Sequence, residues 1–570
     1  MELKKIQEIF NQNIFIIPNY QRGYAWEAEQ VADFINDIKD AVDIDEHYTG
    51  QIIVASKKQE IIGTVSYDVY EVVDGQQRLT TMSIYIQCVC NRLRQLNADP
   101  ERISDYVVYK GKSILQLSHD NNQFYLDYIL DQGKNTNNFS NKSQRNLYLA
   151  KQQISIHLEH YKNKDKLIAE YQVLMHKFKV NFSVLTNSLE AGLVFETMND
   201  RGIALSQMDR VKNYLIYLCN RMKKSKVADL VNDQYGIVFS ELMKVDGSNL
   251  NKVERIDKIE DDFLSCSYFL YNGKNFKESV HHSIKTDFLP KKNIIKKTKQ
   301  KDFEFGEDLE MQRKKIEDLA KHLGKSAKVY ASIFNASFKT EEVNNILRRI
   351  NYLGGLEKHS RLLLSIFLSR NEENTLSVLQ LIENMIFRSK RQPNTNELAL
   401  EIYKKSSVYS IKKIRDDLKE IMNKSCSNKL FSDMMRSIDF YEETKGNNKA
   451  QYFFYNYEFA LAEHRKVESS LPSFEEFCQP NYKKFEIEHI DPQQPNGRKP
   501  LESVNQIGNL TATFDNRRLN NKEFVDKKPT FERSNLCVEK ILTIHETWGE
   551  SNIKTRTIEL IKFAAKKWAY

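Results

Sequence analysis

The sequence holds only seven cysteines, and none of them forms a CxxC pair. That argues against a zinc knuckle and suits a reducing compartment. No stretch approaches the ~20 consecutive apolar residues that a membrane-spanning helix needs. The first residues, MELKKIQEIFNQ, are amphipathic and lack the apolar core of a signal peptide. We therefore expect a cytoplasmic protein without a membrane partner.

A complete phosphate-binding P-loop is also missing. YKGKS at 109–113 and LGKS at 323–326 look like the end of such a loop. The glycine required five residues before each Gly-Lys pair is replaced by Tyr106 and Leu319. The sequence therefore does not indicate a Walker-type ATPase.

What the sequence does have is size and a mild positive charge. Its 570 residues are too many for one hydrophobic core and predict about two to four domains. With 41% apolar and 28% charged residues, the chain is typical of globular proteins. The formal net charge of +8 permits a polyanionic partner without demonstrating one.

The spacing of apolar residues predicts a mixed α/β start and a mostly helical remainder. In the first 85 residues IFIIPNY, YTGQIIVAS and DVYEVV are strand-like, whereas EAEQVADFINDIKDAV has helical spacing. Helical periodicity then dominates to about residue 219, apart from a strand-like VNFSVL, and again over 303–440. Residues 478–535 are loop-rich, and 536–568 are again helical.

The run VVDGQQRLTTMSIYIQ at 72–87 places a turn between a strand and a helix. A helix N-terminus exposes unpaired backbone N–H groups, which suit a phosphate. Gly75 would let the backbone approach a ligand, and Arg78 can clamp an anion. Gln76 and Gln77 add neutral donors and acceptors. Asp74 could hold a magnesium ion or a ribose hydroxyl, or it could simply cap the helix.

The segment NYQRGYAWE at 19–27 sets one cation among flat rings. Arg22 stands between aromatic residues that can stack a nucleic-acid base while the guanidinium contacts a phosphate. These rings are Tyr20, Tyr24 and Trp26. The same residues can equally be ordinary packing at a domain edge.

The segment LVFETMNDRGIALSQMDRVKNYL at 193–215 carries more polar residues than a routine helical hairpin needs. Asn-Asp-Arg-Gly predicts a turn, and Ser206 can cap the helix that follows. Asp209, Lys212 and Asn213 fall one turn apart on that helix. The other polar residues of this segment are Glu196, Asn199, Asp200 and Arg201.

The run FEIEHIDPQQPNGRK at 485–499 ends a short apolar strand on Glu488 and His489. Alone it could be a strand end with a surface histidine, but IGNLTATFDNRRLNNKEFVDKK follows, with Asn509, Asn516 and Asn520. A ββα-metal nuclease needs a strand-end histidine to deprotonate water, two ligands for one divalent metal and an amide that orients the imidazole. Four residues follow one another along the chain in the order that these roles require: Glu488, His489, Asn509 and Asn516. Nearby basic residues could grip DNA phosphates: Arg517, Arg518, Lys522, Lys527 and Lys528.

Taken together, four motifs of the chain resemble those of GmrSD-type restriction proteins, which are modification-dependent. In chain order they are YQRxYxW, VVDGQQRLTT, FETMNDRGxxLSxxDxxKN and FEIEHIDPQ…IGNLT…DNRxLNNxxFxxKK. GmrS and GmrD would here be joined in one chain. The layout is also similar to that of the phosphorothioate-sensing nuclease SspE. The helical middle of the chain carries none of these motifs.

The resemblance implies a mostly helical α+β fold in three parts. Residues 1–250 would form a ParB- and sulfiredoxin-like α/β domain that senses nucleotide, modified DNA or both. Residues 251–440 would be a helical connector, and 441–570 a ββα-metal (HNH) nuclease domain. The expected ligands of a nucleoside triphosphate (GTP, ATP, UTP or CTP) are Asp74, Gly75, Gln76, Gln77, Arg78, Glu196, Asn199, Arg201, Asp209 and Lys212.

In the nuclease domain, the resemblance implies that His489 is the general base. The HNH domains of CRISPR effector nucleases show a similar run, Asp-His-Ile-x-Pro-Gln, followed by two asparagines. That comparison favours Glu488 and Asn516 as ligands of Mg²⁺ or Mn²⁺ and Asn509 as the orienting residue. Asn520 competes with Asn516 for the helix position. This sequence has Glu488 where aspartate is commoner.

The leading hypothesis is a nucleotide-regulated endonuclease that cuts or nicks modified double-stranded phage DNA in bacterial antiphage defence. A homo-oligomer is compatible with the sequence. The expected contacts to DNA or to a base are Tyr20, Arg22, Tyr24, Trp26, Arg517, Lys522, Lys527 and Lys528. Two alternatives stay open: a nucleotide-gated sensor or scaffold with a degenerate nuclease, and a toxin nuclease indifferent to modification.

Overall fold

The computed structural model describes residues 2–570 except 132–138, 186–205, 223, 246–255, 277, 291–294, 298–302, 306–308, 371 and 480–481. The chain packs into two compact units. The N-terminal unit comprises Met1–Gly247 and Glu254–Ala331, and the C-terminal unit contains Ser332–Tyr570. The expected three-part division at residues 250 and 440 stays a prediction.

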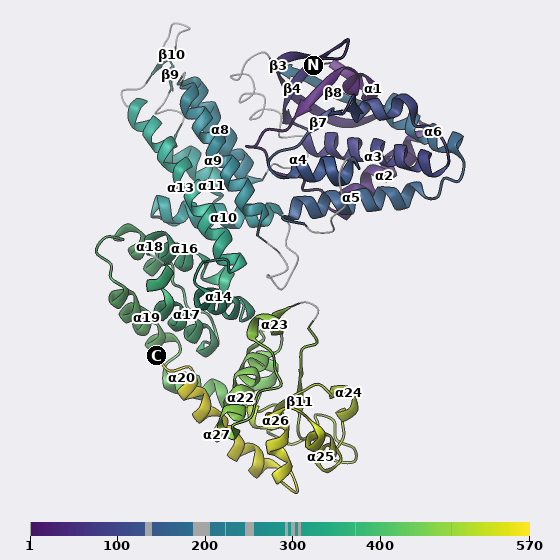
Figure 1. Cartoon of the computed structure of the whole chain (residues 1–570). Coiled ribbons are helices and arrows are strands. Elements are labelled where there is room, and N and C mark those ends of the chain that lie inside the picture. Colours follow the sequence, from purple (N-terminus) through teal and green to yellow (C-terminus); the bar gives the residue numbers. More distant parts are fainter. Residues whose placement is uncertain are drawn as a thin grey trace. The chain divides into compact units, whose positions relative to one another are not determined.

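A sheet of six strands lies in the described part of the N-terminal unit (Figure 1). The strand order is β1 (Glu2–Lys5), β8 (Phe178–Leu185), β3 (His47–Ile62), β4 (Val65–Asp74), β2 (Asn13–Ile16) and β7 (Leu115–Gln116). The β1–β8 and β3–β4 pairs are antiparallel, whereas β3–β8, β2–β4 and β2–β7 are parallel. Of the strand-like runs, YTGQIIVAS, DVYEVV and VNFSVL form strands as predicted, whereas the run that starts at Ile14 is a strand only as far as Ile16.

Helices cover this sheet, and three of them, α2 (Ala28–Asp40), α3 (Gln76–Gln95) and α5 (Lys142–Leu158), lie together beside it (Figure 1). The shorter helices of this part of the chain are α1 (Ile6–Phe10), α4 (Asn121–Phe124) and α6 (Lys164–Gln172). α2 buries Val31, Phe34, Ile35 and Ile38, because residues three and four apart share one side of a helix. That is the face the sequence predicts. α3 begins directly after β4, so the sheet fixes the turn that carries the 74–78 motif.

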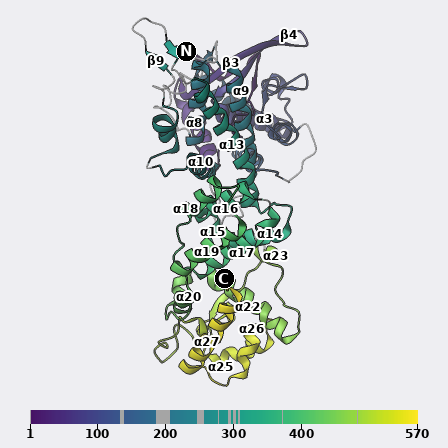
Figure 2. The ribbon, with the colours of Figure 1, turned by 90° about the vertical axis from the view of Figure 1, so that its left-hand side faces the viewer.

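A group of helices completes the N-terminal unit: α8 (Gln207–Arg221), α9 (Ser225–Met243), α10 (Ile256–Asn272), α11 (Val280–Ser283) and most of α13 (Leu309–Asn335). α8 packs against α9, α10 and α11, and α8, α9 and α10 lie side by side in Figures 1 and 2. Ser206 caps α8 by accepting a hydrogen bond from the N–H of Asp209, as predicted. Two small hairpins pair β5 (Val108–Tyr109) with β6 (Lys112–Ser113) and β9 (Ile295–Lys297) with β10 (Phe303–Phe305).

The C-terminal unit is nearly all helical. Its first helices are α14 (Glu341–Tyr352), α15 (Gly355–Lys358), α16 (Ser360–Ser369), α17 (Leu376–Arg388), α18 (Asn396–Lys404), α19 (Ile411–Ser425) and α20 (Asn428–Met435). Later helices are α21 (Phe440–Thr444), α22 (Lys449–Arg465), α23 (Phe474–Cys478), α24 (Asn516–Leu519), α25 (Phe524–Arg533), α26 (Cys537–Lys540) and α27 (Glu550–Lys567). Figure 2 shows α16–α19 as one group and α22, α25, α26 and α27 as another.

Two strands interrupt the helices of this unit. β11 (Glu486–His489) and β12 (Leu510–Thr513) pair antiparallel, and α24 follows β12. The order strand, loop, strand, helix is the one that the nuclease hypothesis requires. The fold is α+β and mostly helical with an N-terminal α/β sheet, as predicted, while the ParB-like and HNH folds stay predictions. Within the described ranges, no helix has the length and apolar character needed to cross a bilayer.

Candidate functional site

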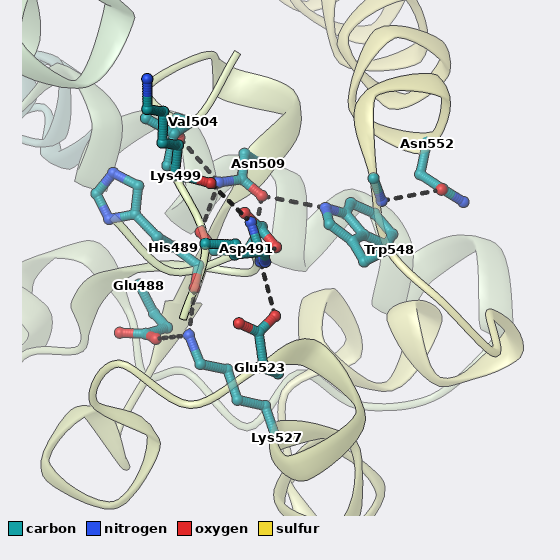
Figure 3. A network of polar contacts seen from close by, with 12 residues as sticks. Glu488, His489, Asp491, Lys499, Val504, Asn509, Glu523, Lys527, Trp548 and Asn552 are labelled. Carbon is teal, nitrogen blue, oxygen red and sulfur yellow. Dashed lines mark hydrogen bonds and ion pairs between the residues drawn. The ribbon is translucent and has the colours of Figure 1, made fainter. Parts of the chain in front are cut away.

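The pair of strands β11 and β12 gathers the predicted nuclease residues (Figure 3). Glu488 and His489 end β11 and are buried, with 6% and 7% of their surface exposed. Asn509 directly precedes β12 and is fully buried. Because His489 lies opposite Leu510 in the antiparallel register, strand pairing itself brings His489 next to Asn509.

The imidazole of His489 lies between an amide and an aromatic ring. Its Nε2 is 3.2 Å from Oδ1 of Asn505, and the ring of Tyr441 meets it edge-on, with 4.5 Å between the ring centroids. Burial lowers the pKa of His489 to about 4, because the imidazolium would lose its hydration. The ring is therefore neutral near pH 7 and able to accept a proton. Sequence reasoning missed Asn505, because an asparagine in a polar loop has no distinguishing pattern.

Glu488 forms a buried ion pair with Lys527 (Figure 3). The Nζ of Lys527 lies 2.6 Å from Oε1 of Glu488 and 2.6 Å from the carbonyl oxygen of His489, and it donates to both. Burial raises the pKa of the Glu488 carboxyl, and Lys527 acts in the opposite direction. The prediction that Lys527 contacts DNA is corrected here. Its side chain is 0% exposed, so its ammonium group serves Glu488 and not a phosphate.

Asn509 fixes the main chain that follows His489 (Figure 3). Its Nδ2 donates to the carbonyl oxygens of Asp491, at 2.9 Å, and Val504, at 2.8 Å. Its Oδ1 accepts from the N–H of Asp491 at 2.8 Å and from Nε1 of Trp548 at 3.1 Å. These bonds hold the loop that follows His489 and do not involve the imidazole itself, so the orienting role of Asn509 stays a prediction.

The two candidate helix ligands lie in different surroundings. Asn516 opens α24, and its Nδ2 donates to the carboxylate of Glu486. Glu486 and Glu488 are two residues apart on β11 and so share one face of the strand. Asn520 directly follows α24 and is exposed. Asn516 is thus the candidate that reaches the acidic face of β11.

The donor atoms on this face suit a hard divalent cation. Lys527 binds Oε1 of Glu488 and leaves Oε2 without a hydrogen bond in the described part of the chain. Asn516 uses its nitrogen on Glu486 and keeps its amide oxygen as a possible ligand. No three His, Cys, Asp or Glu side chains of the described residues are arranged to hold a metal. A metal here would need amide, water and phosphate oxygens as well, which is the usual way Mg²⁺ is bound.

The remaining basic candidates divide by exposure. Arg517, on α24, and Lys522, shortly after it, are exposed, as a contact to DNA phosphates requires. Lys528 is half-buried and donates to the carbonyl oxygen of His545 at 3.0 Å.

In the N-terminal unit, Asp74 and Gly75 form the predicted turn between β4 and α3. Gly75 adopts φ 91°, and a Cβ there would lie 2.9 Å from the carbonyl oxygen of Gln51, so the turn requires glycine. Asp74 does not cap α3, since no side chain does. Its Oδ2 accepts instead from Nε2 of Gln51 at 3.2 Å. The first N–H groups of α3 therefore have no side-chain acceptor of the cap type.

Arg78 and Gln76 stand close to this turn. Nη1 of Arg78 donates to the carbonyl oxygen of Gln51 at 3.2 Å. The guanidinium packs over Gly50, where a Cβ would lie only 2.9 Å from Cζ. Oε1 of Gln76 is buried without a partner in the described structure, and Gln76 and Arg22 line a small cavity.

Gln77 has a structural task that the sequence did not reveal. Its Nε2 donates to the carbonyl oxygen of Gly23 at 3.1 Å, and its Oε1 accepts from the N–H of Ala25 at 2.9 Å. Both ends of the amide thus hold the 19–27 segment against α3. The predicted nucleotide contact of Gln77 is corrected to this clamp.

The aromatic residues of the 19–27 segment are engaged inside the protein. Tyr24 is 4% exposed and its hydroxyl lies 2.8 Å from Oγ1 of Thr81. Tyr20 donates to Glu71, and Trp26 packs against the core. The expectation that Tyr24 stacks a base is corrected, because its ring is buried. Packing at a domain edge, the alternative open from the sequence, accounts for this ring.

Arg22 and Lys212 join the 19–27 segment to the helices that follow. Arg22 lies 3.9 Å from Oδ2 of Asp209 and 3.9 Å from Oε2 of Glu260. Lys212 donates to the carbonyl oxygen of Tyr20 at 3.2 Å, and burial lowers the pKa of its ammonium group. Asp209 and Lys212 thus lie against the 19–27 segment, which Gln77 holds against α3. Sequence reasoning missed Glu260. The other candidates, Glu196, Asn199 and Arg201, lie outside the described residues.

Two protein-family models match the chain. The model of the GmrSD restriction endonuclease, N-terminal domain, matches residues 6–216. The model of GmrSD restriction endonucleases, C-terminal domain, matches residues 426–563. The chain belongs to the GmrSD restriction endonuclease family. No curated protein matches it.

Membership of the GmrSD family confirms the resemblance found in the motifs and makes DNA the partner of this protein. The turn at 74–78 lies inside the matched N-terminal range, and the residues from Glu488 to Asn516 lie inside the matched C-terminal range. Residues 217–425 lie outside both matches, and Glu260 is among them.

Proposed function

We propose that this GmrSD-family protein is a nucleotide-regulated endonuclease that cuts or nicks modified phage DNA at an HNH-type site in bacterial antiphage defence. The observation that carries the proposal is the placement of a buried histidine at the end of β11. His489 sits next to the acidic Glu488, and Asn509 holds the loop behind it. A general base must be held within hydrogen-bond reach of the water that it deprotonates, and the contacts of His489 fix its position.

In the proposed reaction, His489 takes a proton from a water molecule while that water attacks a phosphorus atom of the DNA backbone. A new P–O bond forms from the water oxygen, and the P–O bond to the leaving oxygen breaks. The leaving oxygen takes up a proton from solvent. Asn509 contributes by fixing the main chain after His489, so that the ring need not reorganise during the reaction.

Glu488 and Asn516 are the residues that would hold Mg²⁺ or Mn²⁺. A bound metal would stabilise the negative charge that grows on the phosphate as water attacks. Lys527 holds Glu488 by one oxygen and leaves the other for a ligand. The exposed cations of Arg517 and Lys522 would bind phosphates on either side of the scissile bond.

The nucleotide would bind at the turn that opens α3. Three observations support this part of the proposal. The helix has 20 residues and no side-chain cap, and its N-terminal N–H groups favour an anion. Arg78 supplies a guanidinium in the first turn, and Gln76 has a buried oxygen without a partner in the described structure. Gln77 and Tyr24 have other tasks and are left out of this site.

Cleavage of a panel of phage genomes tests the proposal. The panel contains modified and unmodified DNA, each with Mg²⁺ or Mn²⁺ and with or without each nucleoside triphosphate. We expect modified genomes to be cut, and His489→Ala to cut them at least about a hundredfold more slowly. His464→Ala is the matched control, because His464 is an exposed histidine on α22.

Three results would contradict the proposal in different ways. Unchanged cleavage by His489→Ala would remove the histidine from the reaction. Equal cleavage of every genome would favour a toxin nuclease, and no cleavage of any genome would favour a sensor or scaffold.

A further inference from the structure

His489 makes one side-chain hydrogen bond in the described structure. Its Nε2 lies 3.2 Å from Oδ1 of Asn505. Asn505 lies in the loop between β11 and β12, four residues before the Asn509 of the HNH pattern. This contact therefore comes from a residue that the pattern does not include.

A third side chain shares the oxygen of Asn505. Nε2 of Gln493 donates to the same Oδ1 of Asn505 at 2.8 Å. In this arrangement Asn505 presents its oxygen to two N–H donors. An oxygen can only accept, so the Nε2 of His489 carries a hydrogen. In a neutral imidazole, Nδ1 then holds the lone pair.

The main chain keeps Asn505 in place independently of its side chain. Its carbonyl oxygen accepts from the N–H of Tyr441 at 3.0 Å, and the ring of Tyr441 packs edge-on against His489. Asn509 binds the carbonyl oxygen of the neighbouring Val504 at 2.8 Å. These contacts hold the main chain at Asn505 without its side chain.

We propose that Asn505, supported by Gln493, is the positioning residue that fixes the tautomer and orientation of His489, so that Nδ1 is the atom that takes the proton from water. The inference rests on the proposed function, in which His489 is the base. It adds two residues to the site and assigns the two ring nitrogens different tasks.

Replacement of Asn505 tests this assignment. Asn505→Leu removes the acceptor at similar size, whereas Asn505→Asp keeps an oxygen for both His489 and Gln493. In single-turnover cleavage at saturating Mg²⁺, we expect Asn505→Leu to be about ten- to hundredfold slower, a part of what a general base contributes. Asn505→Asp should recover most of the rate. Mn²⁺ affinity should be unchanged in both, and Asn496→Leu is the control, since Asn496 is exposed on the same loop.

A spectroscopic measurement separates this inference from the nuclease assignment. Long-range ¹H–¹⁵N correlation on histidine-labelled, metal-free protein reports the tautomer without any cleavage, and His489→Ala identifies the signal. We expect one Nε2–H tautomer in the parent protein and in Asn505→Asp, and a mixture in Asn505→Leu. A parent-like tautomer and rate in Asn505→Leu would overturn the inference. A shifted tautomer in a protein whose parent cuts no DNA would overturn the proposed function and leave the contact standing.

Discussion

At the scale of single residues, the buried ion pair of Lys527 and Glu488 is a costly contact to break. The two side chains are 0% and 7% exposed. Lys527→Met would leave the Glu488 carboxylate buried without its partner, at a cost of about 3–5 kcal/mol. We expect faster hydrogen exchange of the amides of β11 and α25 in the full-length chain, corresponding to that loss of local stability.

A second substitution shows whether the charge or the packing is responsible. Glu488→Gln removes the charge that Lys527→Met leaves unpaired, so the double variant should recover part of the lost stability. Lys522→Met is the matched control, since Lys522 is exposed. If the double variant exchanges as fast as Lys527→Met alone, the loss comes from packing and the charge argument fails.

At the scale of elements, Glu260 ties the stability of α10 to pH. It is 1% exposed, and burial raises its pKa to about 8, although Arg22 at 3.9 Å acts in the opposite direction. The ordinary value, 4.5, applies to the unfolded chain. Between these values the folded state binds more protons than the unfolded state, so the stabilising contribution is complete below 4.5 and is lost as pH rises towards 8.

The free energy of opening of α10 should therefore fall between about pH 5 and pH 8, by at most about 1.4 kcal/mol per pH unit. Glu260→Gln cannot ionise and should abolish this slope, which leaves the variant more stable than the parent protein near pH 8. Hydrogen exchange of the α10 amides as a function of pH measures both the slope and the stability near pH 8. Asp229→Asn on α9 is the control, because Asp229 is exposed. Equal slopes in the parent and Glu260→Gln would contradict the role of this carboxyl group.

The elements also show what the sequence could predict. The buried face of α2, the strands and the Ser206 cap depend on neighbours within one or two turns, so their periodicity or local chemistry identifies them. The strand-end pair of Glu488 and His489 was likewise visible, because a short apolar run ends there. Local pattern therefore predicted where polar residues gather.

The partners of those polar residues could not be predicted. Gln77 binds main chain 54 and 52 residues away, and Lys527 reaches a carboxylate 39 residues away. An amide suits a ligand and a main-chain group equally well, and a lysine suits a phosphate and a buried carboxylate equally well. Only the pairing of distant elements decides between them. For the same reason Asn505, and not Asn509, is the residue that meets His489.

At the scale of the whole molecule, the two candidate sites belong to different compact units. The turn at 74–78 lies in the N-terminal unit, and Glu488, His489 and Asn516 lie in the C-terminal unit. Each site is built from side chains of its own unit. Point substitutions should therefore separate nucleotide binding from DNA cleavage, while defence against phage should need both.

Arg78→Ala should weaken nucleotide binding about ten- to hundredfold, since a charge-assisted hydrogen bond is worth about 1.5–3 kcal/mol. Hydrogen exchange of β11 should stay as in the parent protein, because Arg78 contacts Gly50 and Gln51 in its own unit. Arg94→Ala, at an exposed arginine near the end of α3, is the control. His489→Ala should do the reverse, with nucleotide binding intact and cleavage lost.

Plaque counts on a host that expresses each variant then show whether the two activities are connected. If nucleotide regulates cleavage, Arg78→Ala must change protection against modified phage even though every nuclease residue is present. Purified Arg78→Ala must then need about ten- to hundredfold more nucleotide than the parent protein for the same change in cleavage. Parent-like nucleotide binding by Arg78→Ala would remove the turn at 74–78 from the nucleotide site and leave the nuclease assignment untouched. If Arg78→Ala binds nucleotide weakly and still protects fully against phage, the turn at 74–78 remains the nucleotide site, but nucleotide does not regulate defence. A ligand that regulates an activity must bind the active and inactive states of the protein with different affinity.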